Sequence, residues 1–366
     1  MARLQYNSMA KILMAMSGGV DSSVAAALLA QKGHEVVGCF MRLGSAGDDL
    51  DPDVKISHKG CCSINDANDA RTISAKLGMS FYALDFKDDF GRIIDYFVDE
   101  YNAGRTPNPC VRCNDWLKFG KLHDYAKSIG AKYVASGHHA QILQGNEGAE
   151  LHMGADEGKD QSYVLFGANR NRIGEMMLPI GHLQKSEVRD LAKEFNLPVF
   201  NKPDSQEICF VPDDNYANLI SKKTPGSMQK GEVLDPEGNV IGSHEGQQKF
   251  TIGQRRGLGI ALSKPAYVVA KDPVLNTVTI GGSELLDTNI VVANETNWLI
   301  DECEEWTPCK AKIRYNTPAA HGKVRKKGDT IEVQFDEPQR GGAPGQAVVC
   351  YQGTKVICGG WIGQVS

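Results

Sequence analysis

Long hydrophobic runs are absent from this sequence of 366 residues. No stretch reaches 18 apolar residues, so the sequence predicts no membrane span. The first ten residues also lack the apolar core of a secretion signal, and we expect them to form a loose extension. No internal repeat and no low-complexity tract is present. At about 150 residues per domain, the length predicts two or three globular domains.

Cysteine pairs of the zinc-binding kind are scarce too. The chain has ten cysteines, but Cys110 and Cys113 form its only C-x-x-C pair, and a zinc site of this type needs a second pair. We therefore assign no metal-ligand set to the site residues. Because no secretion signal accompanies the cysteines, they favour reduced thiols and a cytoplasmic location.

The lysine of the common phosphate-binding loop is missing as well, because the pattern G-x-x-x-x-G-K-[ST] does not occur. Residues 17–23 read Ser-Gly-Gly-Val-Asp-Ser-Ser instead, between an apolar segment at 11–16 and an alanine- and leucine-rich segment at 24–30. These segments predict a buried strand, a glycine turn and the start of a helix. The glycines allow a ligand to approach closely, and the N–H groups of the first helical turn can donate to an anion.

Asp21 stands among these phosphate donors, where its carboxylate suits a magnesium ion. The plainer alternative is a helix capped after a tight turn, since serine and aspartate are good N-caps. We favour the phosphate site, because the seven-residue string is more specific than a lone glycine motif.

Apolar segments alternate with helical patterns over roughly the first 200 residues. We expect strands at 35–41, 81–86 and 132–136, helices at 64–77, 88–101, 116–129 and 186–195, and a polar loop at 44–60. This alternation predicts an α/β domain at 1–215 with a doubly wound parallel sheet. Met41 then lies at the carboxyl end of a strand, where such sheets bind ligands.

Beyond residue 226, glycine and proline separate short alternating segments. We expect strands at 231–234, 274–280, 310–315, 330–335, 347–351 and 355–358. These predict a small β-rich central module at 216–285 and a C-terminal β-barrel at 286–366. Residues 306–328 include no acid and seven basic residues, Lys310, Lys312, Arg314, Lys323, Arg325, Lys326 and Lys327. This stretch is either a solvated basic face or a phosphate-contacting patch.

Two loops carry cysteines that suggest sulfur chemistry. Prolines fix the loop at 104–114, and Arg105 and Arg112 make it electropositive, which lowers the pKa of a thiol such as Cys113. Cys209 lies in a second predicted loop, about a hundred residues further on. One thiolate can hold sulfane sulfur as a persulfide, and a second thiolate can attack that persulfide.

Seven ordered motifs carry a resemblance that covers nearly the whole chain from Lys11. They are MSGGVDSS at 16–23, GRTPNP at 104–109, CN at 113–114, SGH at 136–138, KDQSY at 159–163, DSQEICF at 204–210 and GQRRGLG at 253–259. The glycine loop resembles that of the ATP pyrophosphatase (PP-loop) superfamily, with its adenine nucleotide alpha hydrolase-like fold. The full set is similar to the bacterial tRNA-specific 2-thiouridylases.

This resemblance implies ATP-dependent 2-thiolation of the wobble uridine in lysine, glutamate and glutamine tRNAs. Implied nucleotide contacts are Ala15, Met16, Ser17, Gly18, Gly19, Val20, Asp21, Ser22, Met41 and Gly137. Implied contacts with the target base are Asn108, Pro109 and Cys110, and those with the rest of the tRNA are His138, Lys159, Asp160, Gln161, Arg314, Tyr315 and Gln346. Implied partners are the anticodon arm of the tRNA and a sulfur-relay or cysteine desulfurase donor protein, with no membrane.

By the same resemblance, Cys209 carries the persulfide and Cys113 attacks it, which leaves a disulfide between the two. One position departs from the family, because well-known members carry aspartate where this chain has Cys110. Cys110 is then a bystander or spare thiol, or it joins Cys113 and Cys209 in holding an iron–sulfur cluster with one open iron. We favour the persulfide route.

Three other functions remain open at this point. A PP-loop synthetase acting on a small molecule would need no RNA and neither cysteine. A nucleotide-binding RNA module would bind tRNA without releasing pyrophosphate. A sulfur carrier would use Cys209 alone. The pair of loop cysteines beside an intact phosphate loop disfavours all three.

Overall fold

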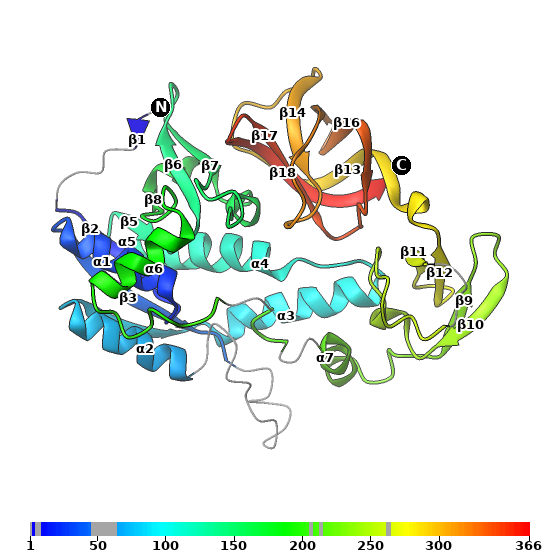
Figure 1. Cartoon of the computed structure of the whole chain (residues 1–366), viewed down its shortest axis with the longest axis horizontal. Coiled ribbons are helices and arrows are strands. Elements are labelled where there is room, and N and C mark those ends of the chain that lie inside the picture. Colours follow the sequence, from blue (N-terminus) through cyan, green and yellow to red (C-terminus); the bar gives the residue numbers. More distant parts are fainter. Residues whose placement is uncertain (1, 4–8, 45–63, 205–207, 212–214, 261–264) are drawn as a thin grey trace. The chain divides into compact units, whose positions relative to one another are not determined.

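The computed structural model describes residues 2–3, 9–44, 64–204, 208–211, 215–260 and 265–366. Apart from Gly44, the polar loop expected at 44–60 lies outside these residues. The chain divides into two compact units (Figure 1). The first comprises Met1–Arg92, Cys110–Asp214 and Thr354–Val356, and the second Ile93–Pro109, Asn215–Gly353 and Ile357–Ser366.

The first unit is built on a parallel sheet of five strands in the order β4-β3-β2-β5-β8. They are β2 (Lys11–Ala15), β3 (Glu35–Arg42), β4 (Ser80–Asp85), β5 (Tyr133–Ala135) and β8 (Met176–Met177). Strand β2 is apolar almost throughout, as expected for a parallel strand covered on both faces. The predicted doubly wound α/β fold is confirmed.

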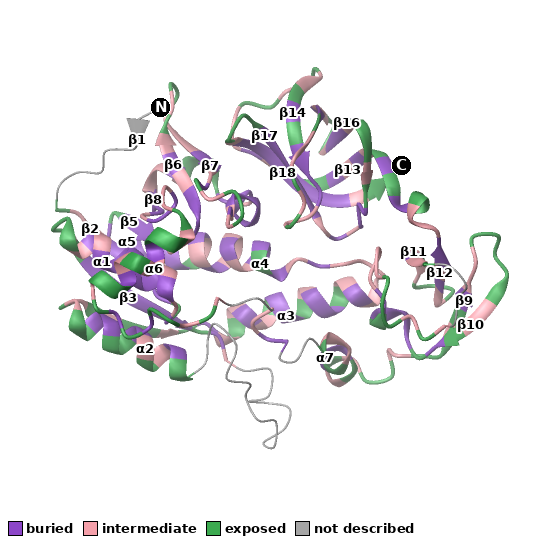
Figure 2. Ribbon diagram, in the orientation of Figure 1, coloured by how far each residue is buried: buried purple, intermediate pink, exposed green. Residues whose placement is uncertain are grey.

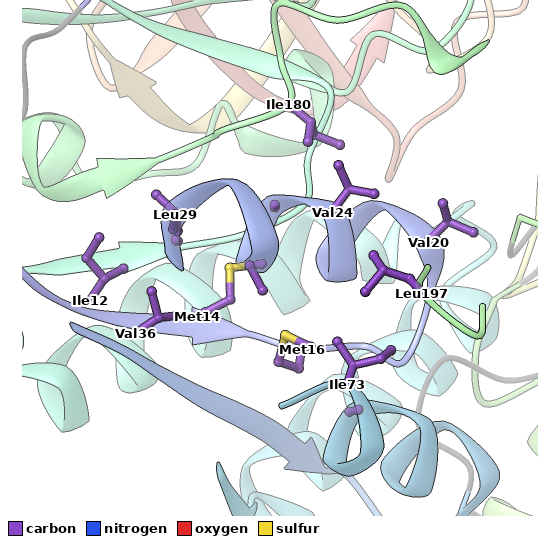
Figure 3. Packing of buried hydrophobic residues seen from close by; sticks show 14 of the residues in the cluster. Ile12, Met14, Met16, Val20, Val24, Leu29, Val36, Ile73, Ile180 and Leu197 are labelled. Carbon is purple, nitrogen blue, oxygen red and sulfur yellow. The ribbon is translucent and has the colours of Figure 1, made fainter. Parts of the chain in front are cut away.

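Helices cover both faces of this sheet. They are α1 (Val20–Gln31), α2 (Ile64–Lys76), α5 (Leu122–Ser128) and α6 (Lys185–Glu194). Helix α1 is rich in alanine and leucine and is buried along most of its length (Figure 2). Figure 3 shows Val24 and Leu29 of α1 on one side of β2 and Ile73 of α2 on the other. This core holds the end of β2 and the start of α1 in place.

A π-helix was not expected within the segment predicted as one helix at 116–129. Helix α4 (Pro109–Arg112) runs into the π-helix η1 (Cys113–Lys121), which continues as α5. Gly130, with φ +72°, ends this segment as predicted. Turns of π-helix are rare and are frequent at functional sites, and this one begins at Cys113.

Shorter elements complete the first unit. The hairpin of β6 (Ala140–Gln144) and β7 (Ala149–Met153) pairs with β1 (Ala2–Arg3). The short helices η2 (Ser162–Leu165) and η3 (Arg170–Glu175) follow the hairpin. Helix α3 (Lys87–Asn102) runs from the first unit into the second.

The second unit contains a small sheet and a barrel. The small sheet has the order β10-β9-β12-β11, with β9 (Gly231–Leu234), β10 (Val240–His244), β11 (Tyr267–Asp272) and β12 (Thr277–Gly281). Helix α7 (Tyr216–Lys223) and the short helices η5 (Gln247–Lys249) and η6 (Ser283–Leu286) also belong to this unit. The strand predicted at 274–280 begins later, because Asp272 accepts hydrogen bonds from the N–H groups of Val274 and Leu275 and holds them in a turn.

The barrel strands follow in the order β18-β13-β16-β15-β14-β17, and pairing of β18 with β17 closes the barrel. They are β13 (Asp287–Trp298), β14 (Thr307–Lys312), β15 (Ala320–Lys327), β16 (Thr330–Arg340), β17 (Ala347–Gln352) and β18 (Lys355–Val365). Alternate side chains, among them Val291, Val324 and Val333, fill the interior. The predicted barrel is confirmed. The boundary between central module and barrel at 285 stays a prediction.

No helix among the described residues is both long and apolar enough to span a bilayer.

Candidate functional site

The glycine turn after β2 combines a left-handed backbone at Gly18 with a close contact that leaves no room for a side chain. Gly18 has φ +68°, and a Cβ atom there would lie 2.2 Å from the backbone oxygen of Asp66. The N–H of Met16, just before the turn, donates to the carbonyl of Cys39 on β3. The turn is therefore fixed on one side by the sheet and on the other by α2.

The serine hydroxyls are used to order the loop. The N–H of Ser17 donates to Ser22 Oγ at 3.2 Å, and Ser22 Oγ and Ser23 Oγ donate to the carbonyl of Gly19 at 3.2 and 2.6 Å. Among the described residues, no side chain caps the N-terminus of α1, whose N-cap is Gly19. The alternative of a side-chain-capped helix is therefore wrong. N–H groups of a first helical turn are a general means of binding an anion.

Gly137 closes the other side of this loop. It follows β5, and a Cβ atom at this position would lie 2.5 Å from the N atom of Ser22. Met41 lies near the carboxyl end of β3 and is buried. The residues expected to contact nucleotide, 15–22 with Met41 and Gly137, therefore all lie at the carboxyl ends of β2, β3 and β5.

Asp21 has a cationic partner that the sequence did not suggest. Both carboxylate oxygens accept hydrogen bonds from Lys185 Nζ at 2.7 Å, and Nε2 of His139 lies 3.4 Å from Oδ1. Burial raises the pKa of Asp21, but the hydrogen bond from His139 and the charge of Lys185 outweigh it and lower the pKa. Asp21 is therefore a carboxylate at neutral pH.

Lys185 also binds Asp204, the first residue of the DSQEICF motif that carries Cys209, at 2.9 Å. Asp204 is bound in addition by Lys159 at 2.9 Å and by Arg189 at 3.0 Å. Burial raises the pKa of Asp204, yet the hydrogen bonds from Lys185 and Lys159 bring that pKa to about 2. The phosphate loop, the KDQ motif and the cysteine motif thus meet through charged side chains.

Lys202 makes a second link between the same segments. Its Nζ donates to the carbonyl of Gly18 at 2.9 Å, to Asp66 at 2.6 Å and to Asp69 at 2.7 Å. Lys202, which precedes Cys209 in the chain, therefore binds the glycine turn directly.

His138 is buried and lies beside the π-helix. Its Nδ1 lies 2.7 Å from Ser136 Oγ, and its ring lies 6.1 Å from that of Phe119. Burial, followed by the charges of Lys118 and His139, lowers the pKa of His138 well below its usual value. The imidazole is neutral at pH 7.

The three residues of the KDQ motif at 159–161 contact different partners. Asp160 is 5% exposed and accepts from the N–H groups of Gly154 and Ser162, each at 3.0 Å. Gln161 accepts from the N–H of His139 at 2.9 Å, next to Asp21. Lys159 is directed to Asp204. Their predicted contacts with tRNA stay predictions.

The three cysteines of interest belong to the first unit. Cys110 is exposed on α4, whereas Cys113 at the start of η1 and Cys209 are half-buried. Phe210, next to Cys209, packs edge-on against Phe90 of α3, with ring centroids 5.5 Å apart. Among the described residues, no group of three or more His, Cys, Asp and Glu side chains is arranged to hold a metal ion.

The electropositive character expected for the first cysteine loop is weaker than predicted. The guanidinium of Arg105 forms an ion pair with Glu100, with Nε to Oε2 at 2.8 Å. Arg112 is buried, and its guanidinium lies 5.0 Å from the centre of the Trp116 ring. The sequence argument missed the acidic partner because Glu100 lies outside the motif.

The remaining predicted tRNA contacts lie in the second unit. Gln346 donates to the carbonyls of Thr106 and Pro107 at 2.9 and 3.1 Å, so it supports the loop that contains Asn108 and Pro109. Arg314 donates to the carbonyls of Gly341 and Ile252 at 2.6 and 3.1 Å and is followed by Tyr315.

The basic stretch at 306–328 is partly neutralised by acids from other segments. Arg325 binds Glu332 at 2.6 Å, and Lys326 binds Glu302. Lys323 and Arg325 lie 4.9 and 4.3 Å from the centre of the Trp306 ring. Lys310 is exposed on β14.

Sequence reasoning missed four residues of the first unit as members of the site. They are His139 and Lys185, which contact Asp21, and Lys202 and Asp66, which bind each other. They lie in no glycine or cysteine motif, and the ion pair between Asp21 and Lys185 spans 164 residues. Hydrophobic periodicity predicts helices and strands, but it carries no information about ion pairs between residues far apart in the sequence.

Family models match three successive parts of the chain. A tRNA methyl transferase HUP domain matches residues 10–213, a tRNA methyl transferase PRC-barrel domain 219–282, and an aminomethyltransferase beta-barrel domain 288–362. The tRNA-specific 2-thiouridylase MnmA of Rhodopirellula baltica is 43% identical over 97% of this chain and 96% of its own length. The enzymes of the same name from Clostridioides difficile and Symbiobacterium thermophilum are 43% and 44% identical over 96% of this chain, and over 98% and 92% of their own lengths.

The chain belongs to the tRNA-specific 2-thiouridylase family. The HUP-domain match covers the parallel sheet with the glycine turn, Lys185, Asp204 and Cys209. The other two matches cover the small sheet and the closed barrel.

Proposed function

We propose that this protein uses ATP to convert the wobble uridine of lysine, glutamate and glutamine tRNAs to 2-thiouridine, with sulfur delivered through a persulfide on Cys209. The observation that carries the proposal is the position of Lys185, which binds Asp21 of the phosphate loop and Asp204 of the cysteine motif. The names of relatives that match over nearly their whole length support the tRNA substrate and the reaction type.

The phosphate loop fits the triphosphate of ATP. The uncapped first turn of α1 offers N–H groups, and Gly18 and Gly137 leave room where a side chain would collide. Asp21 fits as the one carboxylate that a nucleotide-bound Mg²⁺ requires, since such ions take most ligands from phosphate and water. When bound, the ion neutralises phosphate charge.

The first half-reaction activates the base. The uridine O2 attacks the α-phosphorus of ATP, pyrophosphate leaves, and the base oxygen becomes part of a good leaving group, AMP. In the chain, the first-turn N–H groups and Lys185 stabilise the negative charge of the phosphates. The wobble base leaves its stack to reach the site, at a cost of a few kcal/mol.

The second half-reaction delivers sulfur. The Cys113 thiolate attacks the inner sulfur of the Cys209 persulfide, forms the Cys113–Cys209 disulfide and expels hydrosulfide. Hydrosulfide attacks C2 of the activated base, and AMP leaves. A thiol reductant then supplies two electrons to reopen the disulfide. Neutral His138 is a hydrogen-bonding group here and not a fixed charge.

The persulfide route is favoured over an iron–sulfur cluster on Cys110, Cys113 and Cys209, because the described residues include no metal-binding group of three such side chains. Iron and acid-labile sulfide, assayed on anaerobically purified protein, should both be far below one equivalent per chain. One equivalent or more of a cluster would contradict the persulfide route.

The partners follow from this chemistry. The proposal requires the anticodon arm of the tRNA and a protein that donates persulfide sulfur, such as a sulfur relay or a cysteine desulfurase. We propose a cytoplasmic location, where thiols stay reduced and tRNA is present.

The test is a product assay with purified protein, ATP, a persulfide donor and unmodified tRNA. We expect 2-thiouridine by mass spectrometry from the wild type, and none from Cys113→Ser or Cys209→Ser, although both variants still bind ATP. A matched control is Cys303→Ser, a change of a half-buried cysteine of the barrel unit, which should keep full activity. Pyrophosphate release that does not depend on tRNA would favour a small-molecule synthetase.

A further inference from the structure

The carbonyl group of the glycine turn is bound by a lysine that comes from a distant part of the chain. Lys202 Nζ donates to the carbonyl oxygen of Gly18 at 2.9 Å. The same ammonium donates to Asp66 at 2.6 Å and to Asp69 at 2.7 Å, both of which belong to α2. An ammonium has three protons, so the carbonyl and both carboxylates are bound at once. The two carboxylates thus keep the ammonium beside the turn.

The backbone that carries Lys202 is itself fixed. The N–H of Lys202 donates to the carbonyl of Val199 at 2.9 Å, and the carbonyl of Lys202 accepts from Arg189 of α6 at 3.2 Å. Val199 and Leu197 are buried in the apolar cluster that also contains Val20 of α1, and Figure 3 shows Leu197 and Val20 among its side chains. The Lys202 side chain therefore extends from a well-packed turn.

Asp66 supports the glycine turn in two ways. Its backbone oxygen lies 2.2 Å from the place that a Cβ atom of Gly18 would take, so α2 packs directly against the turn. Its side chain is 9% exposed and binds Lys202. Burial lowers the pKa of Lys202, but the hydrogen bonds to Asp66 and Asp69 outweigh it and raise the pKa. Lys202 therefore stays an ammonium at neutral pH.

The direction of the Gly18 carbonyl sets the direction of a hydrogen-bond donor. The peptide bond between Gly18 and Gly19 is planar and trans, so its C=O and N–H groups point in opposite directions. Because the carbonyl faces Lys202, the N–H of Gly19 faces away from Lys202. A peptide between two glycines turns over at little cost, since neither residue has a Cβ atom. A partner for the carbonyl is therefore needed to keep this N–H in one direction.

We propose that Lys202 is a positioning residue that holds the Gly18–Gly19 peptide with the Gly19 N–H directed at the phosphates of ATP. This inference rests on the proposed function only in taking ATP as the ligand. Lys202 acts through the backbone and not by contact with phosphate, because its protons are directed to Gly18, Asp66 and Asp69. The positive charge at the carbonyl also polarises the peptide, which strengthens its N–H as a donor.

The test observes the Gly19 amide by NMR in protein labelled at its glycine nitrogens. In the wild type we expect the Gly19 proton resonance to move downfield when MgATP binds. Loss of one resonance in Gly19→Ala identifies it, and this change is mild because the new Cβ meets only Ser17 Oγ, at 3.4 Å. In Lys202→Met the downfield shift should largely disappear at saturating MgATP. The dissociation constant of MgATP should rise about tenfold or more, as expected when a hydrogen bond to a charged group is lost.

The matched control is Lys76→Met. Lys76 of α2 donates to the carbonyl of Asn196 at 2.6 Å, so it makes the same kind of contact with a backbone oxygen other than that of the glycine turn. This variant should keep the wild-type affinity for MgATP and the wild-type shift of Gly19. Lys202→Arg, which can donate to the same carbonyl, should restore much of both. The dissociation constant of tRNA should stay unchanged in all of these variants, because the effect is confined to the nucleotide.

Two results would overturn the inference alone. One is a wild type that binds MgATP without a downfield shift of Gly19. The other is a shift of wild-type size in Lys202→Met, whether or not MgATP binds more weakly, since Lys202 would then not act through the peptide. If urea unfolding shows that Lys202→Met folds poorly, Lys202→Gln takes its place with the same expectation, because its shorter side chain is polar. Failure of the wild type to bind ATP would instead overturn the proposed function.

Discussion

Single residues of the phosphate loop are held by contacts with residues that lie far away in the sequence. The loop motif was predictable from the sequence because its residues are consecutive. The identity of the cation opposite Asp21 was not, because Lys185 meets it only after the sheet and α6 are packed. The same holds for Lys202, whose ammonium joins the glycine turn to α2.

Replacement of Gly18 by alanine tests the constraint on the turn. Gly18→Ala should lower the free energy of unfolding by about 2 kcal/mol or more, because the new Cβ combines a left-handed φ with a collision against the Asp66 carbonyl. Gly33→Ala is the matched control, since Gly33 has φ +81° but no heavy atom within 4 Å of the added Cβ. Urea unfolding measures both, and equal losses in the two variants would contradict the account.

A histidine at the site should make stability depend on pH. The pKa of His138 is lowered in the folded state, so below the ordinary pKa of about 6.5 the unfolded chain takes up a proton that the folded chain refuses. Stability therefore falls as pH decreases from about 6.5, by up to about 1.4 kcal/mol per pH unit from this residue. Unfolding of the wild type and of His138→Asn at pH 7.5 and 5.5 measures the difference in slope. Parallel slopes would show that His138 is protonated in the folded protein.

Helices and strands were predicted from the sequence more accurately than contacts between individual side chains. The strands β2, β3 and β4 were predicted within a residue or two, because short apolar segments between helical patterns predict a parallel sheet. The π-helix η1 (Cys113–Lys121) was missed, since apolar periodicity was used only to separate helices from strands. Four of the six barrel strands were predicted, whereas β13 and β15 were missed, and β14 begins at Thr307 and not at Lys310.

The basic stretch on β14 and β15 provides a prediction about tRNA binding. Lys310 is exposed, whereas Lys326 is already bound to Glu302. Lys310→Gln should reduce the slope of log affinity against log salt by about 0.7 to 0.9. Lys326→Gln should reduce it by less, because a lysine already paired with a carboxylate of the protein displaces fewer counterions from tRNA. Filter binding across a salt series measures both slopes. A larger effect of Lys326→Gln would show that the exposed face of β14 does not contact tRNA.

At the scale of the whole molecule, the account depends on two cysteines acting in one catalytic cycle with one nucleotide. Cys113 lies at the start of η1, and Cys209 follows a segment that Lys185, Arg189 and Lys202 fasten beside the phosphate loop. The sequence predicted the cysteines and the loop separately. Their link through α6 became visible only in the folded chain.

The most direct measurement is a single turnover with protein that has been loaded with persulfide on Cys209 and then mixed with ATP and unmodified tRNA without reductant. Non-reducing peptide mapping counts Cys113–Cys209 disulfides, and mass spectrometry of the digested tRNA counts 2-thiouridine. The account predicts that one Cys113–Cys209 disulfide accompanies each 2-thiouridine and that no 2-thiouridine forms without ATP. Formation of 2-thiouridine with no Cys113–Cys209 disulfide would contradict it.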